Sequence, residues 1–124
     1  MKTFRISLFI LAFAGLGFIS KAAAQQLSAS AEISLLTASP GQELYSVFGH
    51  SALRVSDPVH GIDEVFNYGT FDFDTPNFYI KFFQGKLLYK LSVTTYNQFL
   101  WEYDYEGRAI VEQRLNLSPE EKET

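Results

Sequence analysis

Short runs of alternating apolar and polar residues make up most of the chain after residue 30, and turn-forming residues separate them. Alternation with a period of two is typical of β-strands that bury one face. The pattern predicts strands at residues 32–37, 49–56, 64–70, 87–93 and 108–117. The second and third strands flank a short loop and predict a hairpin, so we expect a mostly antiparallel sheet.

The strand at residues 49–56 has two different faces, because successive side chains of a strand point to opposite sides. The face that we expect to pack against the core consists of Ser51, Leu53 and Val55. The opposite, semi-polar face consists of His50, Ala52 and Arg54. His50 therefore need not be a buried packing residue.

Two internal segments favour helices. Thr75 is a candidate N-cap, Pro76 suits the first helical position, and aromatic residues follow at near-helical spacing until Gly85. A second helix is predicted to begin after a cap at Thr94 or Thr95 and to end near residue 103. Together with the strands, these segments predict an α+β domain with a mostly antiparallel sheet and two helices.

The last residues predict the start of a further helix. Ser118 is a candidate N-cap, Pro119 suits the first helical position, and Glu121 completes a capping box. A helix with such clear signals normally needs about two or three turns, yet the sequence ends at Thr124. We therefore expect the domain, residues 25–124, to be incomplete at its C-terminus.

The N-terminus predicts a signal peptide at residues 1–24. Lys2 and Arg5 precede an apolar run of about 14 residues, which is shorter than the roughly 20 that a membrane span needs. Small residues follow, and we expect cleavage after Ala24; the alternative is an uncleaved membrane anchor. Residues 25–30 are small and polar, and we expect them to form a flexible lead-in.

The composition of residues 25–124 limits the classes of partner. Seven basic residues stand against fourteen acidic ones, which gives a net charge of −7. This charge argues against nucleic-acid binding, which needs a basic surface, and against docking on anionic lipid. The length suffices for one small domain, and an exported chain without cysteine has to rely on packing rather than disulfides.

The candidate chemistry centres on His50; the other histidine, His60, falls in a predicted surface loop where a solvated role is expected. His50 follows Gly49 at the start of a strand, and imidazole can accept and donate a proton near neutral pH. As a base it would need a polar partner on its other ring nitrogen. Asn67 is the first candidate for this partner and Tyr68 the second, since both lie in the neighbouring strand. The alternative for all three is a structural role.

Other groups carry weaker hypotheses. Ser51 cannot easily reach His50, because adjacent strand residues point to opposite faces. Asp72 and Asp74 could form a carboxylate pair or bind a cation, although loop capping is the commoner role of aspartate. The aromatic residues between 66 and 105 could bind a sugar or a peptide, or pack in the core. No metal or cofactor site is predicted.

Five stretches carry a resemblance to a known family. They are residues 33–41, 43–52, 66–73, 85–89 and 105–108. Together they resemble the Lnb N-terminal periplasmic domain family, a domain of unknown function, over nearly the whole of residues 25–124. That family is similar to circularly permuted papain-like proteins, in which a histidine on a strand precedes the cysteine nucleophile.

The resemblance implies a catalytic role for one residue and a second catalytic element that these residues do not contain. It places the catalytic-type histidine at His50 and implies an Asn-Cys element downstream of the helix that Ser118 begins. The chain departs from this pattern, since it contains no cysteine and family members often carry one where this chain has Ala38. The chain would then be a fragment or a degenerate copy, resembling the N-terminal half of a permuted papain-like fold.

Two functions follow as hypotheses. In the first, this exported domain belongs to a papain-like thiol hydrolase or acyltransferase that acts on an amide or ester in the periplasm or outer cell envelope. Envelope peptides, lipids or glycans are the expected substrates, no cofactor is needed, and no transmembrane helix remains after signal cleavage. In the second, the domain binds a glycan, a peptide or an envelope protein through its aromatic side chains, without catalysis.

Overall fold

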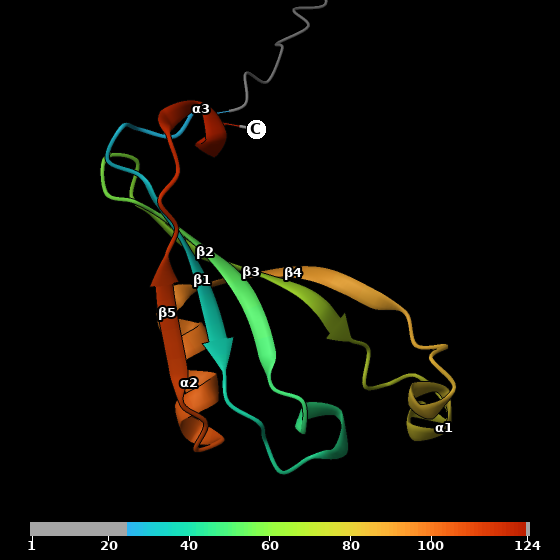
Figure 1. Ribbon diagram of the computed structural model, residues 1–124. Helices are drawn as coiled ribbons and strands as arrows, with labels where there is room; N and C mark the ends of the chain where they lie inside the picture. Colours follow the sequence, from blue (N-terminus) through green and yellow to red (C-terminus); the bar gives the residue numbers. More distant parts are fainter. Residues whose placement is uncertain (1–24, 124) are drawn as a thin grey trace, which may run out of the picture.

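The computed structural model describes residues 25–123, and the predicted signal peptide lies outside them. Five strands form one sheet in which every neighbouring pair is antiparallel, in the order β4-β3-β2-β1-β5 (Figure 1). Their bounds are β1 Glu32–Ala38, β2 His50–Asp57, β3 Ile62–Phe71, β4 Tyr89–Thr95 and β5 Ile110–Arg114. Each of the predicted strands is present, with ends that differ by a few residues at most.

The helices are short, and one of them covers the sheet. α2, Tyr96–Tyr105, packs across one face, whereas α1, Phe78–Phe83, projects beyond the ends of β3 and β4 (Figure 1). α3, Pro119–Lys122, lies at the opposite end of the molecule, and a 3₁₀ turn, η1, spans Leu44–Ser46. The prediction of an α+β domain with an antiparallel sheet is confirmed, with the two internal helices and, as α3, the start of the further helix predicted after Ser118.

Side-chain caps explain where α2 and α3 begin. Thr95 accepts a hydrogen bond from the backbone N–H of Gln98 at 3.3 Å, which satisfies one of the free donors of the first turn of α2. Ser118 and Glu121 form the predicted capping box at the start of α3. Both caps follow from local sequence alone, so both were predictable.

α1 begins two residues later than predicted. Asn77 adopts a left-handed conformation with a φ of 58°, so it cannot continue a right-handed helix back to Pro76. The helix therefore starts at Phe78, and the prediction that Pro76 occupies its first position is wrong.

The core lies between α2 and the sheet. It consists of Leu36, Ala52, Val65 and Phe99, with Tyr96, Tyr103 and Ile110 packed around them. Ala52 is 2% exposed, so the face of β2 that also carries His50 is the one that α2 covers. The prediction that the opposite face of β2 would form the core is wrong. Alternation shows that two faces differ but not which one receives the helix, and the small Ala52 leaves room for Phe99.

The described residues leave the opposite face of the sheet uncovered. Its apolar side chains include Tyr68, Leu91, Val93 and Val111, all of which are exposed. The core of residues 25–123 is therefore one-sided, and Phe99 is its largest fully buried side chain. With so little apolar surface buried, each core residue contributes a large share of the stability.

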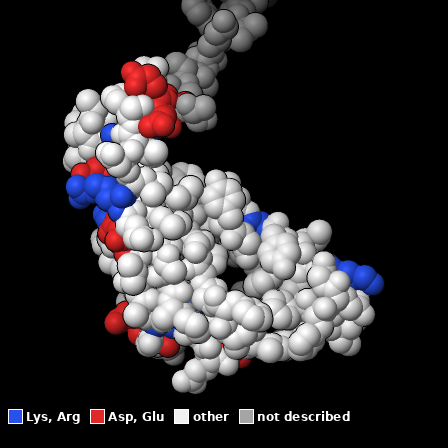
Figure 2. Space-filling model, viewed as in Figure 1, with Lys and Arg blue, Asp and Glu red and all other residues white. Residues whose placement is uncertain are grey.

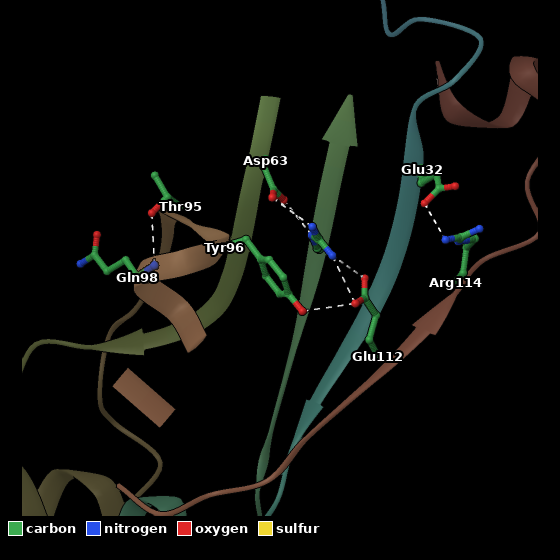
Figure 3. Close-up of polar contacts among 8 residues, drawn as sticks. Glu32, Asp63, Thr95, Tyr96, Gln98, Glu112 and Arg114 are labelled. Atoms are coloured by element: carbon green, nitrogen blue, oxygen red, sulfur yellow. Dashed lines mark hydrogen bonds and ion pairs between the residues drawn. The ribbon is translucent and has the colours of Figure 1, made fainter. Parts of the chain in front are cut away.

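A cluster of charged residues anchors the start of α2 to the sheet (Figure 3). Arg54 donates to Asp63 at 2.7 Å and to Glu112 at 3.0 Å, and its Cζ lies 3.5 Å from the centre of the Tyr96 ring. The hydrogen bond to Asp63 is the main cause that raises the pKa of Arg54. Burial raises the pKa of Glu112, but hydrogen bonds from Ser34 and Arg54 outweigh it and hold this pKa below its usual value. The first turn of α2 is thereby fixed, and its second half extends over the start of β2.

Buried Asp57 ties the N-terminal segment to the sheet. Its carboxylate accepts hydrogen bonds from the backbone N–H of Ser28 at 2.7 Å and from the Ser28 hydroxyl at 2.6 Å. Nδ1 of His60 lies 2.7 Å from the same carboxylate, so this exposed loop histidine also makes a structural contact. Residues 25–30, expected to be a flexible lead-in, are therefore held in place at Ser28.

We expect Asp57→Asn to lower the melting temperature by several degrees at neutral pH and to weaken the loss of stability in acid. Burial raises the pKa of Asp57, but hydrogen bonds from Ser28, His60 and Val59 outweigh it, so the folded-state pKa lies well below its usual value. A depressed pKa stabilises the fold above the unfolded value of about 4, and this stabilisation is lost as the pH falls through the folded value. Urea unfolding of the wild type and the variant at several acid pH values measures this difference. The same dependence of the free energy of unfolding on pH in both proteins would contradict the prediction.

Candidate functional site

His50 and Asn67 form a hydrogen-bonded pair on neighbouring strands. Nε2 of His50 lies 3.0 Å from Oδ1 of Asn67. An amide oxygen only accepts hydrogen bonds, so Nε2 donates this one, and Nδ1 is the ring nitrogen left to accept a proton. This tautomer suits a general base that accepts a proton at Nδ1.

Gly49 explains how the chain delivers His50 to this place. Its φ is 77°, a left-handed value, and a Cβ there would lie 2.8 Å from the carbonyl oxygen of Ala38. Glycine is therefore required where the chain turns from η1 into β2. Tyr103 of α2 then covers the His50 ring, with the two rings inclined by 9° and their centroids 6.5 Å apart.

Tyr68, the second candidate partner of His50, points away from it. Tyr68 follows Asn67 directly in β3, so its side chain lies on the uncovered face of the sheet, where it is 61% exposed. The structure thus brings His50 and Asn67 together and leaves Tyr68 apart from them.

A cavity of about 230 Å³ lies beside the His50–Asn67 pair, between η1, the sheet and the second half of α2. Its polar lining includes His50, Asn67, Ser92, Thr94, Glu102 and Arg108. Its aromatic wall consists of Tyr45, Phe71, Phe73, Phe99 and Tyr103. The cavity is smaller than the roughly 300–1,000 Å³ of sites that enclose whole small molecules, so it suits one group of a larger substrate.

Two buried polar atoms of residues that line this cavity have no hydrogen-bond partner among residues 25–123. They are Oγ1 of Thr94 and Nη2 of Arg108. The other donors of Arg108 are engaged, because Nε donates to the carbonyl of Ser39 at 2.8 Å and Nη1 to Glu106 at 3.0 Å. The Arg108 side chain is only 7% exposed. Since a buried donor without a partner is costly, the cavity favours a ligand that brings a hydrogen-bond acceptor.

The tyrosines of the wall stay neutral. Burial raises the pKa of Tyr103, and the opposing effect of Arg108 is smaller. Burial also raises the pKa of Tyr45, with Glu43 adding to the shift. Both phenols therefore remain protonated at neutral pH, so the fixed charge around the cavity comes from its carboxylates and from Arg108.

The other groups weighed from the sequence lie elsewhere. Ser51 is exposed on the uncovered face and its hydroxyl does not share a side of the sheet with His50. Asp72 accepts a hydrogen bond from the backbone N–H of Asp74 at 3.2 Å and lies 3.6 Å from Nζ of Lys90, which is the geometry of a loop cap. Within residues 25–123, no group of three or more histidines and carboxylates is placed to hold a metal ion.

Sequence reasoning missed four of the six polar lining residues named above, which are Ser92, Thr94, Glu102 and Arg108. Thr94 was considered only as a helix cap, and Arg108 only as the start of a strand and as part of a stretch that resembles a family. Both reach the cavity through tertiary packing, Thr94 from β4 and Arg108 from the turn after α2. The one local signal is that Arg108 directly follows Gly107, the glycine with positive φ just after the end of α2.

The fold and the cavity define a small α+β domain with a histidine–asparagine pair on an antiparallel sheet. Residues 20–124 match the family described as Lnb N-terminal periplasmic domain. The chain therefore belongs to the Lnb N-terminal periplasmic domain family. No curated protein and no solved structure matches the chain.

The family also bears on location. A periplasmic domain fits the export predicted from the N-terminal sequence. Among residues 25–123, no helix is long and apolar enough to cross a membrane.

Proposed function

We propose that the cavity beside His50 is the acid–base half of a thiol hydrolase or acyltransferase site that acts on an amide or an ester. The observation that carries this proposal is the 3.0 Å hydrogen bond between Nε2 of His50 and Oδ1 of Asn67, which leaves Nδ1 as the basic nitrogen. Asn67 is a positioning residue that holds the tautomer and the orientation of the ring. The sequence contains no cysteine, so the nucleophile comes from outside these 124 residues.

The reaction has two steps. Nδ1 of His50 takes the proton of the thiol, the thiolate forms a bond to the carbonyl carbon, and the amine or alcohol leaves with the proton from His50. Water, or an acceptor amine or alcohol, then gives its proton to His50 and attacks the thioester. The carbon–sulfur bond breaks and the thiolate regains its proton. Water as the second nucleophile gives hydrolysis, and an amine or alcohol gives acyl transfer.

The cavity lining supports a carbonyl-containing substrate. Within the described part of the chain, Nη2 of Arg108 and Oγ1 of Thr94 are buried donors without partners, and an oxygen of the substrate would satisfy them. Arg108 is held by Ser39 and Glu106, so a substrate oxygen would meet a preorganised donor.

Sequencing the gene beyond the codon for Thr124 and weighing the native protein test the first requirement of this proposal. We expect either a longer product or a tightly associated chain that supplies a cysteine to the cavity of His50. A native protein that ends at Thr124, with no cysteine-bearing chain associated with it, would refute the thiol mechanism.

A non-catalytic binding module is the second candidate. It is favoured by the pair Trp101 and Tyr105 on α2, whose stacked rings lie 5.8 Å apart and are 67% and 83% exposed. Such exposed rings suit a sugar face or a peptide side chain. Under this alternative, Trp101→Ala abolishes retention on a glycan or peptide array, whereas His50→Ala leaves it unchanged.

A further inference from the structure

We propose that the α1 tip, defined as residues 79–90, docks on an anionic phospholipid surface. The tip comprises most of α1 and the turn that leads into β4, and it lies at the end of the molecule away from α3 (Figure 1). The inference does not depend on the chemistry proposed for His50, because it rests on a different set of residues.

The tip exposes a cluster of large apolar side chains. These are Tyr79 at 49%, Ile80 at 58%, Phe83 at 71%, Leu88 at 83% and Tyr89 at 59% exposure. Single exposed apolar residues are common on soluble proteins, but so many within one short segment mark a surface that meets another apolar phase. Tyrosine has an apolar ring and a polar hydroxyl, which suits it to the boundary between lipid and water.

The charge of the tip indicates that its partner is an anionic lipid surface. The tip contains Lys81, Lys86 and Lys90, and residues 75–90 contain no acidic residue, although Nζ of Lys90 lies 3.6 Å from the carboxylate of Asp72 just outside the tip. In Figure 2, the end of the molecule that carries α1 shows blue atoms, whereas most red atoms lie on the rest of the molecule, where a second blue patch lies among them. Lysine side chains can bury their methylene groups and keep the ammonium at the level of anionic headgroups. The net charge of −7 therefore misleads for this end of the molecule, because it averages a basic tip with an acidic remainder.

A packed aromatic base holds the tip in a defined orientation. Phe78 and Phe82 turn inward onto Phe71, with ring centroids 5.7 and 5.8 Å from it. Their neighbour Phe83 is thereby directed outward. Phe71 also lines the cavity beside His50, so a tip seated on lipid would bring that cavity close to the membrane surface.

Vesicle flotation tests the proposal. The protein is expressed from its full sequence and exported, and its mass shows whether residues 1–24 have been removed. The probes are vesicles of phosphatidylcholine alone and of phosphatidylcholine with about one-third phosphatidylglycerol. We expect binding to the anionic vesicles, weaker binding to the neutral ones, and loss of the difference in about 1 M salt, where the Debye length is about 3 Å. Equal binding to both vesicles at low salt, or none to either, would overturn the proposal.

Paired variants separate the tip from other exposed apolar residues. Phe83→Ser with Leu88→Ser should weaken binding to anionic vesicles by about tenfold or more, because two largely exposed apolar groups lose their contact with lipid. The matched control is Trp101→Ser with Tyr105→Ser, a pair of similar exposure on α2 that should bind as the wild type does. An equal loss in both double variants would overturn the assignment to the tip.

The lysines provide a second comparison. Lys81→Gln and Lys86→Gln should each weaken binding about fivefold, since one basic residue near an anionic surface contributes about 1 kcal/mol. Arg114→Gln, which removes an exposed charge on β5, is the control and should change nothing. Unchanged binding in both lysine variants would contradict the electrostatic part of the proposal.

Labelling gives a test that does not rely on loss of binding. These 124 residues contain no cysteine, so Phe83→Cys and Tyr105→Cys each add one site for an environment-sensitive dye, and any cysteine supplied from outside them is first replaced by serine. We expect the emission of the dye at position 83 to shift to the blue with anionic vesicles and that at position 105 to stay unchanged. A shift at position 83 caused by added unlabelled protein without lipid would overturn the proposal in favour of a second copy as the partner.

Discussion

His50→Ala should lower kcat/KM of the native protein on an amide or ester substrate by about 10²- to 10⁴-fold, the usual contribution of a positioned proton-transfer group. The reason is that Nδ1 of His50 is the ring nitrogen with a free lone pair, since Nε2 donates to Asn67. Steady-state kinetics on activated acyl esters measure the loss, and added imidazole should restore part of the activity.

Two further variants show whether the effect belongs to the pair. Asn67→Ala should lower kcat/KM by about 10- to 100-fold and shift its pH profile, because the ring loses the group that fixes its tautomer. Ser51→Ala changes the adjacent residue on the opposite face and should leave the kinetics unchanged. Full activity in His50→Ala would rule out a base role for this histidine.

Phe99→Ala should destabilise the protein by about 3–5 kcal/mol, a large part of the roughly 5–15 kcal/mol available to a small domain. Phe99 is 1% exposed, belongs to the core under α2, and packs against Tyr103 with ring centroids 4.5 Å apart. Removing the Phe99 ring leaves a cavity in the core, and this core lies on only one face of the sheet. Urea unfolding followed by circular dichroism measures the change, and we expect the urea midpoint of the variant to fall far below that of the wild type.

The matched control lies two residues further along the same helix. Trp101 is 67% exposed, so Trp101→Ala should change the free energy of unfolding by about 0.5 kcal/mol or less. Comparable losses in the two variants would mean that α2 is not seated on the sheet through Phe99.

The strand pattern and the caps of α2 and α3 could be predicted from sequence because they depend on local periodicity and single side chains. The choice of core face could not. Alternation in β2 separates His50 and Ala52 from Leu53, but only the docking of α2 decides which side is buried. An apolar residue such as Leu53 was therefore assigned to the core, while the small Ala52 occupies it.

One part of the candidate site could likewise be predicted from the sequence and another part could not. A contact between His50 and Asn67 could be expected from sequence, because a hairpin places the two strands side by side. The contribution of Arg108 could not be predicted, since it depends on the turn after α2 and on the carbonyl of Ser39, which is 69 residues away in the chain. Donors that come from distant loops leave no local pattern.

The central claim is that His50 generates a thiolate at this cavity, and the rate of alkylation of the native protein by iodoacetamide tests it most directly. We predict one fast-reacting cysteine near neutral pH, with a rate about tenfold or more lower in His50→Ala and unchanged in Ser51→Ala, because the thiolate is the reactive form. A native protein without a cysteine, or equal rates in the wild type and His50→Ala, would contradict the claim.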